Sequence, residues 1–134
     1  MSAIKDLKLL LKSMNPELSG GEFVFCSVSD NALAELNEKP LLVFREKEWA
    51  TVVLEREAAE RHSLAFSGSL ALITLNVHSD LSAVGFLAAV TARLAEHEIS
   101  VNVVSAFHHD HLFVPAEKAE EAMRLLKELQ ESKA

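Results

Sequence analysis

Three of the six histidines in this 134-residue chain lie together at His108, His109 and His111, beside Asp110. Alternate residues of an extended segment face the same side, so His109 and His111 would lie close enough to share a metal such as zinc. A complete site needs at least one further ligand, for which His78 and Asp110 are the candidates. No Cys pair or HExxH pattern accompanies them, and turn histidines also serve as surface groups. Metal binding, acid and base chemistry and a plain surface role all stay open.

A second set of candidate ligand-binding residues stands before a predicted helix and on a later apolar segment. It comprises Asp80, Leu81, Ser82, Ala83, Val84, Gly85 and Asn102. An amino acid carries a carboxylate and an ammonium group, which backbone N–H and C=O groups at a helix start and a strand edge can bind. Gly85 leaves room for a ligand, and the Asn102 amide both donates and accepts. Alternatively, Asp80 or Ser82 caps the helix, Gly85 allows close packing, and Asn102 bonds to a loop.

The rest of the sequence gives little sign of catalysis. Cys26 lies in an apolar segment, where a thiol behaves as a small hydrophobic group. A glycine-rich phosphate loop, a nucleophile elbow and a dinucleotide fingerprint are all missing from the sequence. Thirteen Lys and Arg against 20 Asp and Glu give a net charge of -7, which disfavours nucleic acid and anionic membranes. With a single cysteine and neither a secretory signal nor a spanning segment, we expect a cytoplasmic protein. The missing catalytic motifs lead us to expect that it is not an enzyme.

Apolar periodicity divides the chain into helices and strands. Helices are predicted at 2–14, at 57–62, after the candidate caps Asp80 and Ser82, and after Pro115. Strands are predicted at 22–28, 41–45, 49–54, 70–77, 99–106 and 111–114. The region 70–129 then reads β-α-β-β-α, which is most of a ferredoxin-like unit. The predicted fold class is α+β, with two ferredoxin-like α/β sandwich units whose antiparallel sheets have helices on one face.

The C-terminal unit lacks its last strand, and an open sheet edge invites pairing with another strand. We predict that a strand from the N-terminal half closes this sheet, either 22–28 or the stretch around 64–66. The segment Ser67-Gly68-Ser69 is too short for a flexible linker, so the two units would interlock. The predicted division is a degenerate N-terminal unit at 1–67 and a C-terminal unit at 68–134.

Three sequence segments carry a resemblance to small stand-alone tandem ACT proteins. They are GEFVFCSV at 21–28, LLVFREKEWATVVL at 41–54 and SAVGFLAAVTARLAEHEISVNVVSAFHHDHLFVP at 82–115. The segment 98–105 is also similar to the second strand in the regulatory end of aspartate kinases and in cytosolic arginine sensors. The first half departs from this pattern, with an extra leading helix and no long helix between its first two strands.

The resemblance implies a regulatory ACT module that binds an amino acid effector between ACT units through residues 80–85 and Asn102. It implies a homodimer that acts on a separate regulated enzyme. We expect no cofactor, and the net charge of -7 leads us to expect no nucleic acid and no membrane partner. The alternatives are a structural or assembly protein that keeps the ACT fold without a ligand, and a metal-binding protein built on residues 108–111.

Overall fold

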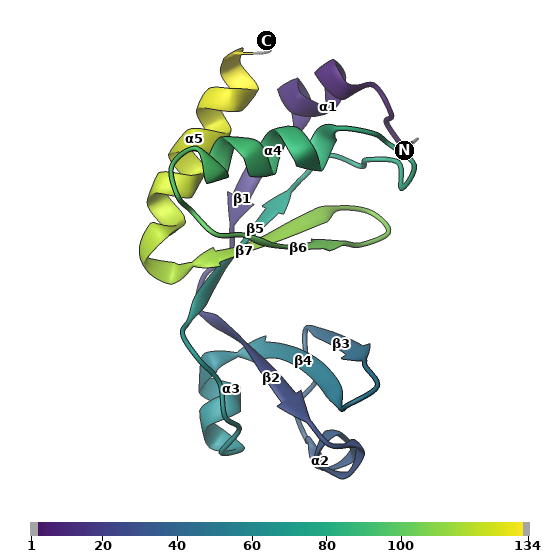
Figure 1. Ribbon diagram of the computed structural model, residues 1–134, viewed down its shortest axis with the longest axis vertical. Coiled ribbons are helices and arrows are strands. Elements are labelled where there is room, and N and C mark those ends of the chain that lie inside the picture. Colours follow the sequence, from purple (N-terminus) through teal and green to yellow (C-terminus); the bar gives the residue numbers. More distant parts are fainter. Residues whose placement is uncertain (1–2, 133–134) are drawn as a thin grey trace. The chain divides into compact units, whose positions relative to one another are not determined.

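The computed structural model describes residues 3–132 and divides into two compact units (Figure 1). The composite unit combines the segment up to Gly20 with the segment from Ala71 onward, and the middle unit spans 21–70. The chain thus begins in the composite unit, forms the middle unit and returns. The sequence prediction divided the chain at 67 and 68, whereas in the structure residues 3–20 pack with the C-terminal part.

The composite unit has a four-stranded sheet in the order β1-β5-β7-β6. These strands are β1 (Pro16–Leu18), β5 (Leu70–Leu75), β7 (Asp110–Pro115) and β6 (Asn102–Ser105). The β6 and β7 strands form an antiparallel hairpin in which Ser105 pairs with Asp110. The β5 and β7 strands are neighbours in the centre of the sheet, so the end of β5 and the start of the hairpin lie close together.

Three helices pack over this sheet: α1 (Leu7–Ser13), α4 (Phe86–Ala95) and α5 (Ala119–Ser132). A 3-10 turn, Ala116–Lys118, precedes α5. Figure 1 shows the three helices on the same side of the sheet. Their inward side chains form one core with the strands, and its members with no exposed surface include Leu10, Ile73, Leu94, Leu112 and Leu125. This core removes a large apolar area from water and fixes the helices on the sheet.

A strand from the N-terminal half closes the composite sheet, as predicted. The closing strand is β1, in which Glu17 pairs with Thr74 and Leu18 with Ile73 in antiparallel register. Neither segment proposed from the sequence fills the edge beside Ile73 and Thr74. The strand at 23–28 pairs along its length with 50–55 and meets β5 only where Phe23 pairs with Leu70, and 64–66 is not in a strand. Strand β1 reaches the open edge because it follows α1 directly, and α1 is packed on α4 and α5.

The middle unit has the strand order β3-β4-β2, formed by β3 (Leu42–Arg45), β4 (Ala50–Glu55) and β2 (Phe23–Val28). Two short helices, α2 (Asp30–Glu35) and α3 (Arg56–Arg61), pack against it. The core of this unit is a separate cluster that includes Val24, Cys26, Val52 and Ala59. The predicted hairpin at 41–54 and the predicted helix at 57–62 are therefore both present, each shifted by one residue or so.

Other sequence predictions need correction at the element ends. The predicted helix at 2–14 begins only at Leu7, because Ile4 forms an isolated parallel bridge with Ser79. Helix α2 was not predicted, although Ser29 caps it by accepting a hydrogen bond from Ala32 N at 3.1 Å. None of the described helices is long and apolar enough to cross a membrane.

Candidate functional site

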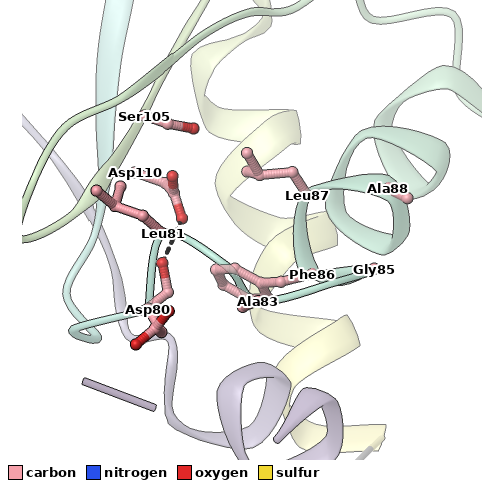
Figure 2. Close-up of a pocket in the computed structure, with 10 residues that line it drawn as sticks. Asp80, Leu81, Ala83, Gly85, Phe86, Leu87, Ala88, Ser105 and Asp110 are labelled. Atoms are coloured by element: carbon pink, nitrogen blue, oxygen red, sulfur yellow. Dashed lines mark hydrogen bonds between the residues drawn. The ribbon is translucent and has the colours of Figure 1, made fainter. Parts of the chain in front are cut away.

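A pocket of about 130 Å³ lies where the end of β5, the start of α4 and the β6–β7 hairpin meet (Figure 2). The loop 79–85 forms one wall, the first turn of α4 forms another, and the paired residues Ser105 and Asp110 form a third. Its lining residues are Ser79, Asp80, Leu81, Ala83, Gly85, Phe86, Leu87, Ala88, Ser105 and Asp110. All of them belong to the composite unit, so its sheet and helices alone shape the pocket.

The first turn of α4 has no side-chain cap. Its N-cap residue is Gly85, with φ of +93°, a backbone conformation that residues other than glycine rarely adopt. The first bond within the helix runs from Ala89 N to Gly85 O at 3.0 Å. The N–H groups of Phe86, Leu87 and Ala88 precede it and find no partner inside the helix. Because these residues line the pocket, the positive end of the helix dipole lies at the cavity.

Asp80 and Ser82 do not cap α4, so the cap prediction was wrong. Instead, Asp80 Oδ1 accepts a hydrogen bond from Ser82 N at 2.8 Å and another from Ser82 Oγ. Ala83 N donates to Asp80 O at 2.9 Å, which closes a tight turn before the helix begins. The Ser82 hydrogen bonds lower the pKa of Asp80 below its usual value, so the carboxylate is ionised at neutral pH. The Asp80 side chain therefore stabilises the loop.

Asp110 is the buried acid of the pocket, with 5% of its surface exposed. Its Oδ2 accepts a hydrogen bond from Ser79 Oγ at 2.9 Å, which joins the loop after β5 to the start of β7. Ser105 lies opposite Asp110 in the hairpin register and lines the same wall. The pocket thus places a carboxylate and a hydroxyl across from the N–H groups at the start of α4.

The structure brings together part of the predicted ligand-binding set. Four of its seven members line the pocket: Asp80, Leu81, Ala83 and Gly85. Ser82 and Val84 are exposed on the same loop without lining the pocket, and Asn102 is exposed on β6, opposite Phe113. The sequence did not point to Ser79, Ser105 or the position of Asp110 in the pocket wall. Ser79 and Asp110 are 31 residues apart, and only strand pairing brings them together.

The histidine cluster forms a chain of ring contacts at the hairpin tip. The ring centroids of His78 and His108 are 5.3 Å apart, and those of His109 and His111 are 6.4 Å apart. His111 Nδ1 lies 3.0 Å from Thr74 Oγ1 on the neighbouring strand. Burial, together with the nearby His109, lowers the pKa of His111 below its usual value. Within residues 3–132, no three His, Cys, Asp or Glu side chains are placed to hold one metal ion.

Cys26 is buried in β2, and burial raises the pKa of its thiol. A thiol with a raised pKa is mostly protonated at neutral pH, and the thiolate is the nucleophilic form. Cys26 accordingly packs with Val24 and Val52 as a small apolar side chain, as its sequence context predicts.

Sequence models of the ACT domain match residues 2–71 and 69–128. No curated protein matches the chain. A protein of unknown function from Vibrio cholerae, described as a possible transport protein, is 48% identical. The alignment covers 96% of this chain and 99% of that protein, with a TM-score of 0.84.

Two more distant structures are similar in fold alone. A protein from Agrobacterium tumefaciens is 18% identical over 86% of this chain and 87% of that one, with a TM-score of 0.71. The regulatory subunit of aspartate kinase from Thermus flavus is 12% identical over 85% of this chain and 95% of that one, with a TM-score of 0.67. The fold, the two consecutive matches and the Vibrio relative agree: the chain belongs to the ACT domain family and carries two ACT domains in tandem.

Proposed function

We propose that this chain is a non-catalytic regulatory module that binds a small amino acid in the pocket at the start of α4. One observation carries the proposal. Phe86, Leu87 and Ala88, at the start of a helix whose N-cap residue makes no side-chain hydrogen bond, line a cavity that Asp110 also lines. A helix start attracts a carboxylate, and a buried acid attracts a cation. A free amino acid carries both charges within a few bonds.

The volume of the pocket limits the size of the ligand. The pocket is partly open and has a volume of about 130 Å³, slightly less than an engineered closed cavity of about 150 Å³ that accommodates benzene, with its six carbon atoms. Glycine, alanine and serine contain five, six and seven non-hydrogen atoms. A large aromatic amino acid would have to place its side chain outside the cavity. We therefore expect glycine, alanine or serine to bind best.

The loop that lines the pocket also offers a surface through which binding can be passed on. Leu81 and Val84 are 68% and 83% exposed, although both are large apolar side chains. A ligand held by the first turn of α4 would fix this loop, and a contact with a second copy of the chain would cover the two side chains. The regulated enzyme would then be a separate protein that recognises the ligand-bound dimer.

A thermal shift screen of the purified protein against each common amino acid tests the proposal. Ligand at 100 times its Kd stabilises the native state by about 2.7 kcal/mol. For a chain of this size, that corresponds to a Tm rise on the order of 10 °C. The expected result is a rise with glycine, alanine or serine and a much smaller one with phenylalanine or tryptophan.

A matched pair of variants separates the pocket from unspecific binding. Ala88 lines the pocket, whereas Ala92 is exposed one turn later on the same helix and does not. Ala88→Leu should fill the cavity and abolish the thermal shift, and Ala92→Leu should preserve it. If no amino acid raises the Tm at millimolar concentration, the proposal is wrong, and a structural ACT protein becomes the better interpretation.

A further inference from the structure

Asp110 has a buried carboxylate that the protein itself only half satisfies. Oδ2 accepts the hydrogen bond from Ser79 Oγ, but within residues 3–132 Oδ1 has no hydrogen-bond partner. Among the described residues, the fully buried side-chain atoms without a hydrogen-bond partner are Glu38 Oε2 and Arg93 Nε. Oδ1, which has no partner in this part of the chain, is not one of them, so it keeps some accessible surface. Figure 2 shows the Asp110 oxygen without a hydrogen bond on the side of Ser105, which lines the same pocket.

No Lys or Arg among the described residues forms an ion pair with Asp110. His111, which follows it in β7, faces the other side of the sheet, where it contacts Thr74. A largely buried carboxyl group is stabilised by a positive charge or by further hydrogen bonds. No described residue supplies either to Oδ1, so a cationic group from outside the chain can bind there.

We propose that Asp110 is the specificity-determining residue of the pocket and selects ligands that carry an unsubstituted ammonium group. The inference rests on the proposed function and deepens it. The ammonium group donates to Asp110 Oδ1 and to Ser105 Oγ, while the ligand carboxylate accepts from the N–H groups of α4. Ser79 is a positioning residue, because its hydrogen bond holds the carboxylate with Oδ1 toward the cavity.

The first test uses the unchanged protein and three ligands of similar size: alanine, propionate and ethylamine. Propionate is alanine without its ammonium group, and ethylamine is alanine without its carboxylate. Truncating one partner of a buried charge pair costs at least about 2 kcal/mol, or about 30-fold in affinity. Calorimetry should therefore show alanine binding at least about 30-fold more tightly than propionate. Equal affinities would overturn the role of Asp110 and leave the proposed function standing.

The second test changes the acid. Asp110→Asn keeps the shape and removes the charge, so it should weaken alanine binding by at least about 30-fold and leave propionate binding within a few fold. Ser79→Ala should lower the ratio of the alanine affinity to the propionate affinity. Ser79→Thr keeps the hydroxyl and should preserve the ratio of the unchanged protein. A purely structural role for Ser79 would weaken both ligands equally. Circular dichroism checks the fold of each variant, and the ligand series decides the matter if a variant unfolds.

Ethylamine separates failure of this inference from failure of the proposed function. If neither alanine nor any other amino acid binds, the proposed function is overturned. The Asp110 carboxyl carbon can still be followed by NMR in the unchanged protein while ethylamine is added. A saturable shift of that resonance supports ammonium recognition by Asp110, and an unchanged resonance overturns it.

Discussion

Leu10 offers a direct test of the interlocked arrangement, in which residues 3–20 complete the composite unit. This side chain has no exposed surface and belongs to the core shared by α1, α4, α5 and the sheet. Replacing a buried leucine by alanine removes its burial energy and leaves a cavity, at a cost of about 2–5 kcal/mol. With about 3 kcal/mol as the central value, Leu10→Ala should lower the Tm by about 12–24 °C in a unit of this size.

The neighbouring leucine supplies the control. Leu9 lies on the same helix but is 40% exposed, so Leu9→Ala should change the free energy of unfolding by well under 1 kcal/mol. Urea unfolding followed by circular dichroism measures both variants. Amide exchange can locate the effect, because Leu112 on β7 and Leu125 on α5 share the core with Leu10. Their exchange should accelerate in Leu10→Ala.

If Leu10→Ala and Leu9→Ala lost the same small amount of stability, α1 would not be part of the composite core in solution. The packing of α1 on α4 and α5 would then be refuted, and closure of the sheet by β1 would need another cause. The single tryptophan, Trp49, lies in the middle unit. Its fluorescence therefore follows that unit separately.

Three further substitutions test other parts of the composite unit. Gln130 Oε1 accepts a hydrogen bond from Asn15 N at 3.1 Å, and Gln130 Nε2 donates to Lys12 O at 3.0 Å. Gln130→Ala should therefore lower the free energy of unfolding in urea by about 1–2 kcal/mol, and the control Glu131→Ala, at an exposed position, should be near neutral. Gly85→Ala should lower the Tm by an amount equivalent to about 1–2 kcal/mol, because alanine is strained at the Gly85 φ of +93°. The control Gly20→Ala should be tolerated, because a Cβ at Gly20 would meet nothing within 4 Å. His111 has a lowered pKa in the folded state, so the unfolded chain takes up the proton first below about pH 6.5. The free energy of unfolding should therefore fall as the pH falls below about 6.5. His111→Gln should flatten this part of a profile of the unfolding free energy measured from about pH 8 to about pH 5.

The sequence predicted most of the fold because most elements carry strong apolar periodicity. Helix α5 places Ala122, Leu125 and Leu126 on its buried side, and β2 and β4 are rich in branched residues. The two elements that were missed are short. Strand β1 has three residues and begins at Pro16, which sequence reasoning takes as the end of a helix. Helix α2 has six residues and none of them is buried, so it shows no apolar stripe.

The candidate site was predictable only where it is local in sequence. A glycine followed by a long apolar helix indicates the start of α4, and this led to Gly85 and the loop before it. The acid that faces this loop is 25 residues further along and lies within a histidine cluster, so Asp110 was interpreted as a turn residue or metal ligand. Its partner Ser79 carries no motif. Their hydrogen bond depends on the register of the sheet, which short-range patterns do not determine.

The N-terminal segment connects the fold to the pocket. Ile4 N donates to His78 O, and Asp80 N donates to Ile4 O, both at 2.8 Å, so the first residues of the chain hold the loop that begins at Ser79. A Cβ added at Gly85 would lie 3.5 Å from Leu7 Cδ2, which places α1 directly against the start of α4. Residues 4–18 thus close the sheet and support two walls of the pocket. Ligand binding at α4 would accordingly stabilise the packing of the N-terminal segment, and looser packing of that segment would weaken binding.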